Sequence, residues 1–231
     1  MKTLKELVKV KLNLQDLIRL GVQYDGGYVT SRIALDASKK LYTYGVGPNW
    51  QFEKDYVTIY EHKQAEMYDH TVDVNNTGSD RLLFYKSPLA TTSTSTTFDE
   101  SRDNTIPVFL KLDVEGAEYD FFEKADLSTY SNVTGIVCEF HRLSHPDILV
   151  RFKKVLEKLQ EYYDIIHVHG NNYASLFNEE GFIFPVTSEI SFLHKNLSVN
   201  YAEYQDIEYP LKGLDCSNAP HGKDHCFKVY R

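Results

Sequence analysis

Residues 107–119 read PVFLKLDVEGAEY, an apolar run that gives way at once to acidic residues and a glycine. Pro107–Leu112 has the length and composition of a strand that is buried in a sheet. The stretch Gly116–Ala125 has a helical pattern. A buried strand that leads through a polar turn into a helix is typical of a parallel sheet with helices on both faces.

The same alternation of strands and helices extends in both directions from this segment. Further strands are expected at Lys40–Tyr44, Arg81–Tyr85, Val133–Cys138, Ile165–Val168 and Glu189–Leu193, and one more at either Val57–Tyr60 or Ala65–Tyr68. Helices are expected at Asn13–Leu20, Trp50–Tyr56 and His145–Tyr163, where apolar residues recur every three or four positions. The pattern predicts an α/β fold with a mostly parallel central sheet.

The length of 231 residues predicts one domain over 1–231. We expect residues 1–24 to form a helical N-terminal segment and residues 195–231 to form an irregular C-terminal extension.

Charge and hydropathy exclude several kinds of partner. The formal net charge is −8, and no cluster of Lys and Arg is longer than a pair, so we expect no nucleic-acid partner. No apolar run approaches the ~20 residues of a membrane span, and the N-terminus lacks the apolar core of a signal peptide. We therefore expect a cytoplasmic protein with reduced thiols. Oligomeric state is left open by the sequence.

Polar residues follow five of the expected strands directly. They form the groups Gly45-Val46-Gly47, Asp69, Asp113-Val114-Glu115-Gly116, Glu139-Phe140-His141 and His169-Gly170-Asn171-Asn172-Tyr173. In a parallel sheet these groups meet at one edge, where ligands bind. Five such groups predict a functional site.

The glycine pair suits a nucleoside ligand better than a dinucleotide. A dinucleotide turn needs a third glycine where this chain has Trp50, which argues against NAD or FAD. A carboxylate that ends the second strand can hold the ribose hydroxyls. Asp69 is the candidate if that strand is Ala65–Tyr68, and Glu61 is its competitor.

The run Leu110–Tyr119 resembles the K-[IL]-D-V-E-G-A-E motif of FkbM-like methyltransferases that use S-adenosylmethionine. Shorter matches follow the same order along the chain, at 25–28, 44–47 with 52–53, 68–71, 139–141 and 169–172. The resemblance covers roughly Gly21 to Leu193. It implies a Rossmann-like class I methyltransferase fold and O-methylation of a hydroxyl, often on a sugar or natural product.

Methyl transfer from a sulfonium requires an acceptor oxygen held in line and a group that removes its proton. We predict Asp113, His141 and His169 as catalytic residues, with His141 favoured as the base. Gly45, Gly47, Asp69 and Asp113 are the predicted cofactor contacts. The predicted acceptor contacts are Asn171, Asn172 and Tyr173.

Three alternatives remain open at this point. Asp113, Glu139 and His141 or His169 offer the mixed carboxylate and imidazole ligands that suit a divalent metal, although no metal is assigned. A nicotinamide-dependent oxidoreductase and a non-catalytic nucleoside-binding module would fit the same architecture. We expect a small-molecule acceptor, a sugar nucleotide or a glycan.

Overall fold

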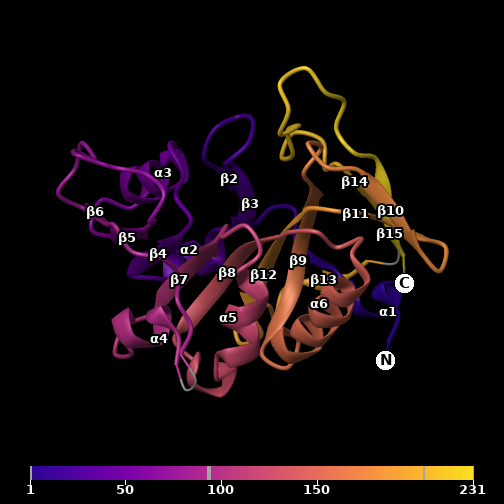
Figure 1. Cartoon of the computed structure of the whole chain (residues 1–231), viewed down its shortest axis with the longest axis horizontal. Coiled ribbons are helices and arrows are strands. Elements are labelled where there is room, and N and C mark those ends of the chain that lie inside the picture. The colour runs from indigo at the N-terminus through magenta and orange to yellow at the C-terminus, as the bar shows by residue number, and fades with distance from the viewer. Residues whose placement is uncertain (1, 93–94, 205, 231) are drawn as a thin grey trace.

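A seven-stranded sheet forms the centre of the molecule, in the order β6-β5-β4-β7-β8-β12-β9 (Figure 1). The structure is a computed structural model that describes residues 2–92, 95–204 and 206–230. The strands of this sheet are β4 Lys40–Tyr44, β5 Gln64–Tyr68, β6 Leu82–Tyr85, β7 Val108–Leu112, β8 Val133–Phe140, β9 Tyr163–Gly170 and β12 Ser188–His194. The five strands β6, β5, β4, β7 and β8 pair with their neighbours in parallel, whereas β12 runs antiparallel to both β8 and β9.

Helices cover both faces of this sheet. They are α1 Leu4–Leu7, α2 Arg32–Ala37, α3 Gln51–Ile59, α4 Thr97–Ser101, α5 Glu118–Lys124 and α6 Pro146–Leu159, with a 3-10 turn at Leu127–Thr129. On β8, the Cβ position of Gly135 lies against Ala34 of α2, whereas Phe140 packs against Phe122 of α5 and Phe152 of α6. Residues an odd number apart point to opposite faces of a strand. Figure 1 accordingly shows α5 and α6 in front of the sheet and α2 behind it. The predicted fold class is confirmed.

Four smaller antiparallel pairs surround the main sheet. They are β1 Lys11–Leu12 with β13 Ala202–Glu203, β2 Leu17–Leu20 with β3 Tyr28–Ser31, β10 Leu176–Glu179 with β11 Phe182–Pro185, and β14 Asp206–Tyr209 with β15 Phe227–Tyr230.

These pairs correct the expectations for both ends of the chain. The helix expected at Asn13–Leu20 is a turn followed by β2, which satisfies its backbone groups by pairing with β3. Asp16 fixes this turn by accepting hydrogen bonds from the Ser31 hydroxyl and the Ile33 amide. The C-terminal extension, expected to be irregular, contains β13, β14 and β15.

The strand order brings the start of β12 to the edge of the sheet where the predicted site residues lie. The sequence pattern did not predict this. The strands β4, β5, β7, β8 and β9 all end at this edge, and the antiparallel β12 begins there. Glu189, near the start of β12, is therefore opposite Glu139 on one side and His169 on the other. β8 and β12 lie between β7 and β9, so the strand that carries His169 does not flank the strand that ends before Asp113.

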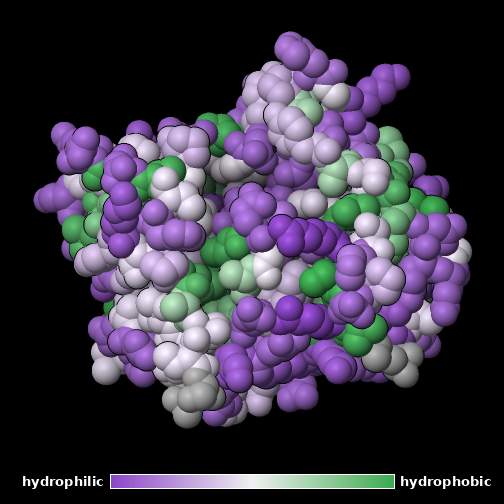
Figure 2. Space-filling model, viewed as in Figure 1, coloured by the Kyte–Doolittle hydropathy of each residue, from purple (hydrophilic) through white to green (hydrophobic). Residues whose placement is uncertain are grey.

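The visible surface is mainly polar. Figure 2 shows hydrophilic residues over most of this face, with hydrophobic residues in smaller groups near its middle and toward its left and right sides. The described part of the chain contains no helix with the length and hydropathy that a membrane span requires.

Candidate active site

A cavity of about 420 Å³ opens at the carboxyl ends of β4, β5 and β7, and Gly45, Gly47, Asp69 and Asp113 are among its lining residues. Gly45 and Gly47 have φ angles of 77° and 63°, a region that glycine adopts without strain. A Cβ on Gly45 would lie 1.6 Å from the carbonyl oxygen of Asp113, so this glycine permits close packing of two strand ends. A Cβ on Gly47 would meet nothing within 4 Å, so its absence leaves space beside the cavity.

Asp69 fixes the conformation of the glycine turn. Its Oδ2 accepts the amides of Val46 and Gly47, both at 2.9 Å, and its Oδ1 accepts the amide and hydroxyl of Thr71, both at 2.6 Å. Burial acts to raise the pKa of Asp69, but the hydrogen bonds from Thr71, Gly47 and Val46 outweigh it and lower the pKa. A carboxylate has about four acceptor positions, and all four are engaged here. Glu61 precedes β5 at the opposite end of the strand, so it does not compete with Asp69 for this position.

Asp113 follows β7 and lies where two cavities meet. Its Oδ2 accepts a hydrogen bond of 2.8 Å from the hydroxyl of Tyr28. Burial raises the pKa of Asp113, although Lys111 and the Tyr28 hydrogen bond oppose that effect. Lys111 is itself buried and lies 3.7 Å from Glu53, its nearest carboxylate partner.

The second cavity has a volume of about 300 Å³ and shares Asp25, Asp113 and Glu115 with the first as lining residues. It is also lined by Glu139, His141, Asn171, Tyr173, Ala174 and Thr187. Of the nine residues that line the second cavity, four are Asp or Glu, and none of the nine is Lys or Arg. The shared wall therefore concentrates negative charge between the two cavities.

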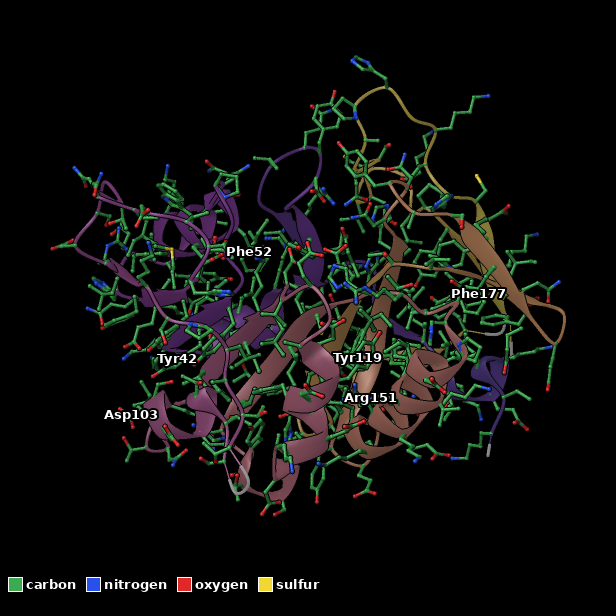
Figure 3. All side chains as sticks on the ribbon, viewed as in Figure 1. Tyr42, Phe52, Asp103, Tyr119, Arg151 and Phe177 are labelled. Carbon is green, nitrogen blue, oxygen red and sulfur yellow. The ribbon has the colours of Figure 1, made fainter. Side chains whose placement is uncertain are left out.

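His141 is held by a buried carboxylate on α5. Oε1 of Glu118 accepts the backbone amide of His141 at 2.9 Å and lies 3.3 Å from its Nδ1. The Tyr119 hydroxyl donates to the carbonyl of His141, and Figure 3 shows Tyr119 on α5 close to Arg151 on α6. Burial lowers the pKa of His141, but Glu118, Glu139 and Asp113 outweigh it and raise the pKa to about 9.

Glu139 is nearly inaccessible and lies among other acidic groups. Burial raises its pKa well above the usual range, and the nearby charges of Asp113 and Glu189 raise it further. Its Oε1 accepts a 2.8 Å hydrogen bond from the side-chain amide of Asn171, and its Oε2 lies 3.3 Å from the Tyr28 hydroxyl. Asn171 thus lies in the second cavity, and its role as an acceptor contact stays a prediction.

Two predicted residues lie outside both cavities. His169 is 1% exposed, and its nitrogens face Glu189 at 3.0 Å and Asp224 at 3.1 Å. Burial lowers the pKa of His169, but these carboxylates raise it to about 11. The Asn172 side chain binds the hydroxyl of Ser217 and so attaches the C-terminal segment to the end of β9. The structure therefore brings Asp113, His141, Asn171 and Tyr173 together, but not His169 or Asn172.

Sequence reasoning missed Tyr28, Glu118 and Glu189 as members of the site. Tyr28 ends the Asp25-Gly26-Gly27-Tyr28 motif, and Glu118 lies in the motif at 113–118. The sequence therefore indicated both segments, but it did not predict the side-chain contacts of these two residues. Glu189 lies near the start of the antiparallel strand β12, whereas the predicted site residues all follow the ends of the expected strands.

Residues 13–166 match the model of the methyltransferase FkbM domain. Among solved structures, the chain is similar to the tRNA methyltransferase TrmK of B. subtilis, with 9% identity, 72% of this chain and 65% of that chain covered, and a TM-score of 0.39. It is also similar to the precorrin-6y C5,15-methyltransferase of Geobacter metallireducens GS-15, with 9% identity, 71% and 87% coverage, and a TM-score of 0.40. At these TM-scores neither likeness bears on the acceptor. No curated protein matches the chain.

Proposed function

Because this chain belongs to the family of methyltransferases defined by the FkbM domain, we propose that it methylates a hydroxyl oxygen of a sugar or sugar nucleotide, with S-adenosylmethionine as methyl donor. Polysaccharide or natural-product biosynthesis would use such a reaction. The acceptor class and the cytoplasmic location are part of this proposal.

One observation carries the proposal: the two cavities adjoin along Asp25, Asp113 and Glu115. The donor fits the larger cavity, where Gly47 leaves space and Asp69 orders the turn that faces it. The acceptor fits the smaller cavity. Donor and acceptor would then meet at Asp113, whose carboxylate favours the positive charge of a sulfonium.

The donor supplies an electrophilic methyl group. The acceptor oxygen forms a bond to the methyl carbon, the carbon–sulfur bond breaks, and the hydroxyl proton must pass to a base. A pKa of about 9 favours the protonated form of the His141 imidazole at neutral pH in the absence of ligands, which argues against its predicted role as the base. The raised pKa values of Asp113 and Glu139 support these carboxylates as proton acceptors instead.

The charge of the second cavity restricts how the acceptor binds. Four carboxylates line this cavity, so the diphosphate of a sugar nucleotide would be repelled and only the sugar hydroxyls would enter. Asn171 offers an amide within the cavity, and Tyr173, which is 67% exposed, offers a ring at its rim. Both groups suit a polyhydroxylated acceptor.

A direct test is incubation of the protein with S-adenosylmethionine and a panel of sugars and nucleotide-linked sugars, followed by mass spectrometry. We expect one panel member to gain one methyl group. Calorimetry that detects NAD binding and no S-adenosylmethionine binding would favour the oxidoreductase alternative.

A further inference from the structure

The imidazole of His141 has one nitrogen that makes no hydrogen bond among the described residues. The side chain is about nine-tenths buried, and its Nδ1 side is occupied by Glu118. Its Nε2 lies 3.5 Å from Glu115 Oε2, 3.9 Å from Asp113 Oδ1 and 4.0 Å from Glu139 Oε1. These distances exceed an ordinary hydrogen bond. This nitrogen thus faces three carboxylates across a gap.

The gap has the dimensions of a cation site. One ligand atom from each of Asp113, Glu139 and His141 lies within 4.8 Å of the other two. A cation about 2.1 Å from each ligand can join atoms up to about 4.2 Å apart, and the two distances from Nε2 to Asp113 and Glu139 fall within that limit. Two carboxylates and one imidazole form a ligand set suited to Mn²⁺ or Mg²⁺.

Glu118 supplies the support that such a histidine needs. Histidines that bind metals usually donate their other ring N–H to a carboxylate, which fixes the tautomer and the ring orientation. Glu118 is fully buried, faces Nδ1 with Oε1, and accepts the Gly116 amide with Oε2 at 2.7 Å. With Nδ1–H directed at Glu118, the lone pair of Nε2 points into the cavity.

A second group of carboxylates, Asp25, Glu139 and Glu189, has similar spacing but a different environment. The side-chain amide of Asn171 lies between Asp25 and Glu139, and that of Asn218 lies between Asp25 and Glu189. Asp25 Oδ1 thus faces two amides, and both oxygens of Glu189 already have a partner, in Asn218 and His169. In the group that contains His141, Nε2 and Asp113 Oδ1 make no hydrogen bond among the described residues, Glu139 Oε1 accepts one from Asn171, and all three residues line an open cavity.

We propose that Asp113, Glu139 and His141 bind one divalent cation in the second cavity, next to the donor site. This inference rests on the proposed function for its chemical meaning: the cation binds two neighbouring oxygens of the acceptor and lowers the pKa of the hydroxyl that is methylated. The acceptor oxygen then bonds to the methyl carbon and the carbon–sulfur bond breaks. Because Asp113 and Glu139 hold the cation in this arrangement, the hydroxyl proton passes to Glu115 or to water instead of to either of them. The preferred acceptor is therefore a sugar with a free vicinal diol.

The test uses Mn²⁺ alone as the probe, with the full chain freed of metal by a chelator and then dialysed. Electron paramagnetic resonance of free Mn²⁺ should reveal one bound ion per chain. His141→Ala and Glu139→Gln each remove a ligand and should weaken this binding by more than tenfold. Glu118 is not a ligand of the proposed cation but orients His141. Glu118→Gln should therefore weaken Mn²⁺ binding by about 10–100-fold, as expected for a group that orients a ligand.

His169→Gln is the matched control, because His169 is also buried, at 1% exposed against 9% for His141, and is also flanked by carboxylates. It should bind Mn²⁺ like the wild type. Circular dichroism and S-adenosylhomocysteine binding verify that each variant is folded. Absence of stoichiometric Mn²⁺ binding, or wild-type binding by folded His141→Ala, would overturn the site. Metal binding is measured without turnover, so a protein that binds Mn²⁺ but methylates nothing contradicts the proposed function alone.

Discussion

Replacement of Asp69 by Ala tests whether this carboxylate acts on the donor through the glycine turn or through the ribose. The four hydrogen bonds that Asp69 accepts occupy its acceptor positions. We therefore expect Asp69 to shape the turn at Val46 and Gly47, and not to bind the ribose hydroxyls as the strand pattern had suggested.

The expected loss in the free energy of unfolding follows from the four hydrogen-bond donors that lose their partner in Asp69→Ala. The amide of Val46 is buried, whereas those of Gly47 and Thr71 are partly accessible to water. One buried unsatisfied donor costs about 1–3 kcal/mol, and the hydrated donors cost less. We expect Asp69→Ala to lower the free energy of unfolding by about 2–4 kcal/mol and to weaken S-adenosylhomocysteine binding by roughly tenfold or more, because the turn is no longer fixed.

The assay is a double-mutant cycle in which one change is made in the protein and one in the ligand. Calorimetry measures how tightly the wild type and Asp69→Ala each bind S-adenosylhomocysteine and its 2′-deoxy and 3′-deoxy analogues. If Asp69 acts through the turn, removal of a ribose hydroxyl costs the same in both proteins, and the coupling energy stays below about 0.5 kcal/mol. A coupling energy of about 1.5–3 kcal/mol, the range for a hydrogen bond to a charged group, would refute this reasoning and assign Asp69 to the ribose.

Three further predictions concern His141, the pair Asn171 and Asn172, and His169. His141→Ala should lower turnover by about 100-fold or more, because it removes a ligand of the cation that is proposed to lower the pKa of the acceptor hydroxyl. Donor affinity should change little, since His141 does not line the donor cavity. A loss below about threefold in steady-state kinetics would make His141 structural. Asn171→Ala should raise the Michaelis constant of the acceptor, whereas Asn172→Ala should leave it unchanged and cost about 1 kcal/mol of stability; an equal rise for both would place Asn172 at the acceptor. The folded-state pKa of His169, about 11, is above the unfolded value of 6.5, so its stabilisation is present below pH 6.5 and is lost as the pH rises toward 11. Denaturant titrations should show wild type losing stability relative to His169→Gln between about pH 7 and pH 10, and a constant difference would contradict the charged state of His169.

The part of the fold that local pattern predicted is the central sheet and its helices. Apolar runs such as Val133–Cys138 are buried on both faces, and their composition alone indicates this. β2 was predicted as a helix because Leu14, Leu17, Ile18 and Leu20 suit a helical period, yet Leu14 is 55% exposed and pairing with β3 decides the conformation. Pairing with a distant segment outweighs local propensity.

The site was predicted where it depends on single strand ends and missed where it depends on strand order. Asp113 and His141 follow adjacent strands, and the structure brings their side chains to within 3.9 Å. His169 lies near the end of β9, but insertion of β12 between β8 and β9 places that strand at the edge of the sheet. The same insertion brings Glu189 into the polar network, and no local pattern predicts either effect.

The central claim is that the chain transfers a methyl group from S-adenosylmethionine to a sugar hydroxyl, and one labelled reaction tests it directly. The protein is incubated with donor that carries a ¹³C-methyl group and with the acceptor panel, and products are examined by mass spectrometry and carbon NMR. We predict one ¹³C-methyl group per product with the chemical shift of a methyl ether, and loss of this signal in Asp113→Ala. A label on nitrogen or carbon, or no label on any acceptor from a protein that binds the donor, would contradict the account.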